Sequence, residues 1–159
     1  RIRLYSRELK TIAKYILSTL KNKPIFEHLQ TIPGVGKIVA LTIYYEVGDL
    51  ARFASAKQFC SYARVVPGLA QSGDVIRRGR GSKQGNPHLK WAFNQAAAIS
   101  VRHYGYIRSF RQKHLARRRS KARRMISLSI VSHKLAIAAY HVLRGDVPFD
   151  KELMFGKAS

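Results

Sequence analysis

Acidic residues and cysteines are scarce in this sequence. Its 159 residues hold 8 Asp and Glu against 30 Lys and Arg, which gives a formal net charge of +22 at pH 7. This excess is larger than solubility requires and indicates a polyanionic partner, with a nucleic acid as the first candidate and an anionic membrane surface as the second. The single cysteine, Cys60, excludes a disulfide within the chain and is typical of a reducing compartment.

Long apolar runs and clusters of metal ligands are also missing. No apolar run approaches the ~20 residues that span a bilayer, and the aromatic residues do not line one face opposite the cations, so we expect no membrane contact. The few carboxylates do not gather as a two-metal nuclease requires. The six histidines lack metal-ligand spacing, and neither a phosphate-binding loop nor a hydrolase elbow occurs. We therefore predict no metal site in this chain.

The spacing of apolar residues predicts a mainly helical, compact domain. A hydrophobic content of 46% is enough for a core. Apolar residues between positions 9 and 20 recur at helical spacing, and Pro24 ends that helix. We interpret residues 1–24 as the end of a coiled coil and residues 25–159 as the domain itself. Because the chain starts at Arg1 with a helical pattern, we expect it to be a piece of a longer protein.

A helix-hairpin-helix element is predicted between residues 25 and 43. A short helix is followed by Pro33-Gly34-Val35-Gly36-Lys37 and by a second apolar helix. The glycines permit a tight turn and leave amides free at a helix start, where phosphate binds, and Lys37 adds a positive charge. We therefore predict that Gly34, Gly36 and Lys37 hold a nucleic-acid backbone. The alternative is a corner between two helices that serves packing alone.

Capping residues mark the other helices. Gly48 is placed to end the second helix, and Ser55 with Gln58 forms a capping-box pattern at the start of a third. Asn86 and Pro87 together form a start signal for a longer helix. A strongly apolar helix is expected from Ile126 to Leu143, and a short hairpin around residues 69–76.

A glycine-rich basic stretch occupies residues 71–87. It holds four glycines and four cations around two serines, with Asp74 as its only acid. Glycine lets a backbone approach a partner closely, and the planar fork of arginine matches phosphate oxygens. We predict a loop that presents the hydroxyl of Ser72 to a nucleic-acid backbone and holds its phosphates with four residues: Arg77, Arg78, Arg80 and Lys83. A solvated basic loop is the alternative.

A second basic region lies between Ile107 and Met125, where no acid occurs. Cations in such a run bind phosphates, which sets affinity and salt dependence but reads no sequence. From this region we predict five nucleic-acid contacts: Arg117, Arg118, Arg119, Arg123 and Arg124.

The chemistry that this chain offers is a hydroxyl among cations. A serine attacks a phosphodiester when a base or a metal activates it and cations stabilise the developing charge. The stretch around Ser72 supplies the cations but no activating group.

Several ordered motifs together resemble the C-terminal domain of bacterial insertion-sequence transposases of the IS110 and IS1111 types, the bridge-RNA-guided recombinases. The resemblance extends from about Leu20 to Asp150. The motifs are Leu29-x-x-Ile32-Pro33-Gly34-Val35-Gly36, Glu46-x-Gly48-Asp49-x-x-Arg52-Phe53, Phe59-x-x-Tyr62-Ala63-x-x-Val66-Pro67, Gln71-Ser72-Gly73 and Ser82-Lys83-x-Gly85-Asn86-x-x-Leu89. Two positions depart from the commoner pattern: Arg64 stands where glycine is frequent, and Gly68 where a basic residue is frequent.

The resemblance implies a larger enzyme. Such proteins join an RuvC-like domain with Asp-Glu-Asp-Asp metal ligands, a coiled coil and this domain, whose serine, Ser72 here, becomes covalently linked to cleaved DNA. It implies Mg²⁺ in the RuvC-like domain and no cofactor in this chain. A structured bridge RNA would guide donor and target DNA, and a dimer or tetramer would bring the metal to the serine. We expect a cytoplasmic, nucleoid-associated location in a bacterium or archaeon.

Two main hypotheses follow. In the first, the chain is the catalytic-serine domain of an RNA-guided transposase, which binds nucleic acid alone but recombines it only with the metal-binding domain. In the second, it is a non-catalytic helix-hairpin-helix module that grips DNA or RNA, and Ser72 is only a phosphate contact. A membrane-surface role ranks third.

Overall fold

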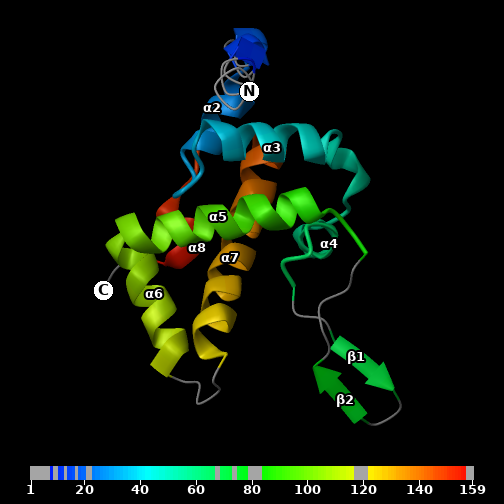
Figure 1. Ribbon diagram of the computed structural model, residues 1–159, viewed down its shortest axis with the longest axis vertical. Coiled ribbons are helices and arrows are strands. Elements are labelled where there is room, and N and C mark those ends of the chain that lie inside the picture. The colour runs from blue at the N-terminus through cyan, green and yellow to red at the C-terminus, as the bar shows by residue number, and fades with distance from the viewer. Residues whose placement is uncertain are drawn as a thin grey trace.

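The computed structural model of the chain is a mainly helical domain with one β-hairpin (Figure 1), which confirms the expected fold class. It describes residues 8, 11–12, 14–16, 18–20, 23–66, 84–116 and 122–156, and the backbone of 69–72 and 75–78. In chain order the elements are α2 (Pro24–Gln30), α3 (Lys37–Val47), the short 3₁₀ helix η1 (Leu50–Arg52), α4 (Ala56–Tyr62), β1 (Leu69–Ser72), β2 (Val75–Arg78), α5 (Pro87–His103), α6 (Gly105–Ala116), α7 (Arg123–Gly145) and α8 (Lys151–Phe155).

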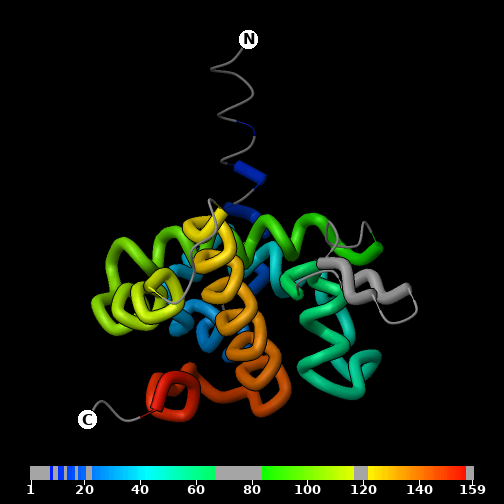
Figure 2. The backbone as a smooth tube through the Cα atoms, turned by 90° about the horizontal axis from the view of Figure 1, so that it is seen from below, coloured from blue at the N-terminus to red at the C-terminus, as the bar shows by residue number. Residues whose placement is uncertain are grey.

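Helices α5 and α7 cross at the centre of the domain (Figure 1) and form its most extensive interhelical contact. Small residues on α5, Ala96 and Ala97, are fully buried and let neighbouring backbones come close. The buried hydroxyl of Ser132 on α7 donates to the side-chain oxygen of Asn94 on α5 at 2.9 Å. Figure 2 shows α7 between α6 on one side and α4 on the other. The core therefore surrounds α7.

An aromatic cluster anchors α4 in this core. Phe59 of α4 is fully buried, and its ring centroid lies 6.0 Å from that of Phe93 on α5 and 5.9 Å from that of Tyr140 on α7. Phe53 approaches Phe59 edge-on at 5.4 Å, an arrangement that aromatic quadrupoles favour. The chain just before the hairpin is therefore fixed to the rigid centre of the domain.

The predicted helix ends are confirmed. The side chain of Asn86 accepts hydrogen bonds from the amides of His88 and Leu89 at 2.8 and 3.1 Å, with Pro87 next to it. Ser55 accepts from the Gln58 amide at 3.4 Å. Gly48 follows α3 with a φ of +58°. These signals are local to the sequence, which is why they could be read from it.

Two α-helices, α6 and α8, were not predicted, because contacts between distant residues stabilise them. Helix α6 is mostly polar, but its Phe110 packs on Phe155 of α8 with ring centroids 5.3 Å apart. Arg108 donates to the carbonyls that end α5, and Arg111 donates to the Arg124 carbonyl at 3.3 Å and to the Ser127 hydroxyl at 3.2 Å. Part of the second basic region is therefore a packed helix.

Helix α7 is the one helix among the described residues that is long and apolar enough to cross a membrane. Its apolar window has a mean hydropathy of 1.4, and half of that window is buried inside the domain. Val131, Leu135 and Ala139 are among the fully buried residues. The apolar character of α7 is accounted for by its place in the core.

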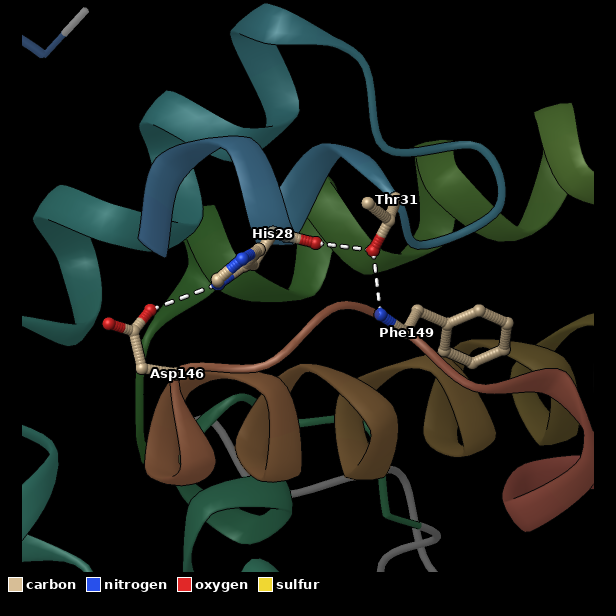
Figure 3. Close-up of polar contacts among 4 residues, drawn as sticks. All are labelled: His28, Thr31, Asp146 and Phe149. Carbon is tan, nitrogen blue, oxygen red and sulfur yellow. Dashed lines mark hydrogen bonds and ion pairs between the residues drawn. The ribbon is translucent and has the colours of Figure 1, made fainter. Parts of the chain in front are cut away.

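A polar contact fastens the segment that follows α7 to α2 (Figure 3). Nδ1 of His28 lies 3.0 Å from Oδ1 of Asp146. The hydroxyl of Thr31 accepts from the Phe149 amide at 2.7 Å and donates to the His28 carbonyl at 2.6 Å. Leu20, which precedes α2, is buried in the same core. The predicted division between residues 24 and 25 stays a prediction.

We expect the thiol of Cys60 to be chemically inert in the native protein. Cys60 is 0% exposed, and burial raises its pKa from 9.0 to about 12. Because the thiolate is the reactive form, a disulfide reagent at about pH 8 should modify the native protein at least ~100-fold more slowly than the protein unfolded in guanidinium chloride. Raising the pH above 9.0 should lower stability, since the unfolded thiol ionises first. Equal rates for native and unfolded protein would contradict the burial.

Candidate functional site

Ser72 ends the first strand of the hairpin. Strands β1 and β2 are antiparallel, and Ser72 pairs with Val75 at the turn end of the ladder. Arg77 pairs with Ala70 two positions away, ~6.6 Å along the strand. The backbone therefore brings Ser72 and Arg77 into one small hairpin, with Arg78 at its far end.

The remaining predicted phosphate contacts of the loop are not placed. Arg80 and Lys83, like Arg117, Arg118 and Arg119, lie outside the described residues, and so do the side chains of both strands. For these positions the predicted roles remain predictions.

The base of this loop is closed by backbone contacts. The amide of Asn86 donates to the carbonyl of Tyr62 at 2.7 Å, so the chain leaves α4 and returns to α5 at one point. Gly85 has a φ of +101°, and a methyl group there would overlap the Tyr62 carbonyl oxygen. Only glycine fits this close approach without strain.

A polar cluster surrounds that closure and was missed as a unit by sequence reasoning. The Asn86 side chain, on a residue only 7% exposed, donates to the carboxylate of Glu46 and to the Tyr62 hydroxyl, the latter at 3.5 Å. The Arg52 guanidinium lies over the Tyr62 ring, 4.5 Å from its centroid. Hydrogen bonds from Asn86 first and Arg52 second lower the pKa of Tyr62. Glu46, Arg52, Tyr62 and Asn86 all occur in the motifs quoted for the family resemblance. Their presence there was the only sign in the sequence that they belong together.

Gly34, Gly36 and Lys37 were predicted to hold a nucleic-acid backbone together, but in the turn before α3 Gly34 has different surroundings from the other two. Gly34 has a φ of +78° and packs on α5, where a methyl group would overlap the Ala96 carbonyl. Gly36 and Lys37 are exposed at the start of α3. No side chain caps this start and its first turn holds no acid, so its first amides have no side-chain acceptor at the positive end of the helix dipole. The two helices and the turn are present, whereas the helix-hairpin-helix geometry stays a prediction.

The start of α7 has a similar character. Arg123 and Arg124 are exposed in its first turn, no side chain caps the helix, and no acid is near in sequence. Cations at a helix N-terminus oppose the helix dipole, and a bound anion relieves that repulsion. The arrangement favours phosphate contact by these two arginines.

The described residues do not offer a metal site. Within them, no three side chains of His, Cys, Asp or Glu come together in a way that could hold a metal ion. The cluster at Glu46 brings one carboxylate to an amide and a phenol, which are hydrogen-bonding partners.

Comparison with known proteins points to transposases. A family model described as "Transposase IS116/IS110/IS902 family" matches residues 26–112. A pilin gene-inverting protein of Moraxella bovis is 30% identical over 158 residues, which cover 96% of this chain and 48% of that protein. A transposase for insertion sequence element IS1111A of Coxiella burnetii is 33% identical over 99 residues, 62% of this chain and 25% of that protein. The chain thus spans about half the length of the pilin gene-inverting protein and matches a quarter of the length of the transposase.

The two glycines of the turn should respond differently to alanine. Gly34→Ala should cost at least about 2 kcal/mol of unfolding free energy, because it combines positive φ with overlap against α5. Gly36→Ala should stay within about 0.5 kcal/mol, since a methyl group there meets nothing within 4 Å. Urea unfolding measures both. Equal effects would show that Gly34 has no packing role.

Position 64 should prefer glycine to alanine. Arg64 has a φ of +57°, the left-handed region that costs a residue with a Cβ about 1 kcal/mol. Arg64→Gly should therefore be about 1 kcal/mol more stable than Arg64→Ala, because both variants lose the same side-chain contacts and only glycine relieves the backbone. Thermal unfolding of the two variants tests this. An alanine variant as stable as the glycine variant would show that the backbone is not strained.

Proposed function

Because the chain belongs to the IS116/IS110/IS902 family of transposases, we propose that it is the serine-bearing domain of an enzyme that cleaves and exchanges DNA strands, with Ser72 as the nucleophile. The observation that carries this proposal is the family match over residues 26–112, which includes the whole loop and its closed base. The position of Ser72 at the turn end of an antiparallel hairpin supports it, since that end can be presented to a partner.

The proposed step is a transesterification. The Ser72 oxygen attacks a backbone phosphorus, a serine–phosphate bond forms, and the bond from phosphorus to the departing DNA oxygen breaks. The serine proton passes to a base, and the departing oxygen takes up a proton. Arg77, Arg78, Arg80 and Lys83 stabilise the negative charge that develops on the phosphate. The covalent intermediate keeps a phosphodiester-like bond, so the strand can be rejoined without a high-energy cofactor.

Activation of the serine belongs to a part of the protein outside this chain. The resemblance implies Mg²⁺ in an RuvC-like domain, and the described residues of this chain provide no ligand set for such an ion. We therefore assign to this chain the nucleophile and the phosphate contacts alone. A dimer or tetramer of the full-length protein would bring the activating groups to Ser72.

Nucleic-acid binding in this proposal uses the exposed helix starts. Gly36 and Lys37 hold one phosphate region and Arg123 and Arg124 another, with Arg117, Arg118 and Arg119 adding charge. Part of the +22 net charge serves a guide RNA. Relatives named for pilin gene inversion and for an insertion sequence match the same chain, and both processes require breaking and rejoining DNA.

A second candidate is a binding module without catalysis. The uncapped, acid-free starts of α3 and α7 favour it, because they bind phosphate whether or not Ser72 reacts. In that case Ser72 contributes only a hydrogen bond to the backbone of the nucleic acid.

Ser72→Ala should abolish strand exchange and leave DNA binding nearly intact. The full-length protein, incubated with its RNA, Mg²⁺ and labelled target DNA, should yield a DNA adduct on the tryptic peptide that contains Ser72. Ser72→Ala should lose the adduct and slow exchange at least about 1,000-fold, with the Kd for DNA within about 3-fold.

Ser82→Ala is the matched control, because Ser82 is the other serine of the basic stretch. It should keep the adduct. DNA cleavage that leaves no adduct and survives Ser72→Ala would mean that metal-activated water cuts the DNA, and the binding module would then be the better description.

A further inference from the structure

The contact between the two ends of the Ser72 loop needs specific interactions to stabilise it. Loop closure costs conformational entropy that grows with loop length, and here it joins Tyr62 to Asn86, which are 24 residues apart. One backbone hydrogen bond, from the Asn86 amide to the Tyr62 carbonyl, contributes about 1 kcal/mol. The side chains around this bond supply the rest of the fastening.

Asn86 has two separable roles in this place. Its side-chain oxygen caps α5 by accepting from the amides of His88 and Leu89. Its side-chain nitrogen is a donor. It donates to the carboxylate of Glu46 on α3 and to the hydroxyl of Tyr62 on α4. A helix start needs only the oxygen. The donated hydrogen bonds therefore serve to join α3, α4 and α5.

Glu46 is one of only 8 acids in the chain, and it is half-buried, which is uncommon for a carboxylate. A carboxylate removed from water is costly unless it is hydrogen-bonded, and Asn86 provides that bond. The Arg52 guanidinium over Tyr62 places a positive charge on the same ring to which Asn86 is bonded. The cluster thus combines residues that lie 40 positions apart in the sequence.

A rigid path connects the cluster to the core. The Tyr62 ring lies 5.3 Å from that of Phe53, and Phe53 lies 5.4 Å from the buried Phe59. Through these contacts the cluster holds both ends of the loop at fixed places relative to the core. Displacement of Asn86 would move the returning end of the loop relative to the departing end.

We propose that Glu46 and Asn86 are positioning residues, which join both ends of the Ser72 loop to α3 and so set where the serine meets the phosphodiester. The proposal rests on the proposed function for the role of Ser72, but the fastening itself depends only on described contacts. Neither residue touches the reacting atoms. They act by holding the loop in the reactive geometry, for which small displacements cost large factors in rate.

Asn86→Asp separates the two roles of Asn86. A carboxylate keeps the cap of α5 but cannot donate to Glu46, and it places a second negative charge beside it. In the full-length protein, with RNA, Mg²⁺ and DNA, we expect the single-turnover rate of Ser72 adduct formation to fall about 10- to 100-fold. The Kd for DNA should stay within about 3-fold, because the proposed phosphate contacts at the starts of α3 and α7 lie outside the loop.

The double variant Glu46→Gln/Asn86→Asp reverses donor and acceptor. The new amide donates to the new carboxylate, the cap is kept, and the pair carries one negative charge as before. We expect this variant to recover the adduct rate to within about 3-fold of the wild type. Glu46→Gln alone keeps an acceptor oxygen for Asn86 and is the matched control that should behave as the wild type.

Hydrogen exchange separates failure of this inference from failure of the proposed function. Backbone amides of the two strands, residues 69–72 and 75–78, in the full-length protein should exchange faster in Asn86→Asp and return to the wild-type rate in the double variant. If Ser72→Ala keeps the adduct, the nucleophile is wrong, and the exchange data still test the fastening. If Asn86→Asp does not fold, Glu46→Ala removes the same hydrogen bond and takes its place. A double variant no better than Asn86→Asp in both rate and exchange would overturn the inference.

Discussion

Helix α5 constrains two of the regions that we propose to contact nucleic acid. At its start, Asn86 closes the base of the Ser72 loop, and ten residues later the Ala96 carbonyl receives Gly34 of the turn before α3. These points lie ~15 Å apart along one rigid helix. That separation corresponds to the rise of about four to five base pairs of duplex DNA. The turn that carries Gly36 and Lys37 and the base of the Ser72 loop are therefore held at a fixed spacing by a helix whose own position is set by its crossing with α7.

Four of the eight acids of the chain make contacts that stabilise its structure. Glu46 joins α3 to α5, Asp49 accepts from the Ala51 amide at 2.8 Å to start η1, and Asp150 caps α8. Asp146 pairs with His28. These four carboxylates are engaged in contacts within the chain, whose net charge is +22. Some cations are structural as well, since Arg108 and Arg111 bind helix carbonyls. The cations that remain for a polyanion include those at the starts of α3 and α7 and those in the sequence of the loop.

What could be predicted from the sequence was what local chemistry determines. The caps at Ser55 and Asn86 and the break at Gly48 depend on neighbours within a few residues, and all three were found. Helices α6 and α8 depend on the ring contact between Phe110 and Phe155. Because these residues lie 45 positions apart, no local sequence pattern predicts the two helices. The glycines of the turn were predicted as one grip, yet Gly34 packs on α5, because only the fold reveals what lies opposite its α-carbon. The bond between Glu46 and Asn86 is hidden from sequence for the same reason. The role of Ser72 came from family resemblance, which no contact within the described residues tests.

The division of chemistry in the proposed function has a physical consequence. A domain that presents a serine but no activating group can bind DNA through its cations without cutting it, because a neutral hydroxyl is a weak nucleophile. Reaction then requires that the activating groups arrive at the serine that this domain presents. If the loop moved freely, part of the binding energy of assembly would be consumed in ordering it, and the reaction would slow. In our proposal the contacts of Glu46 and Asn86 fix both ends of the loop in the folded domain, before DNA or partner subunits bind. This accounts for a half-buried carboxylate in a chain that otherwise has few acids: its role is to hold the loop, and the charge that faces the nucleic acid stays positive.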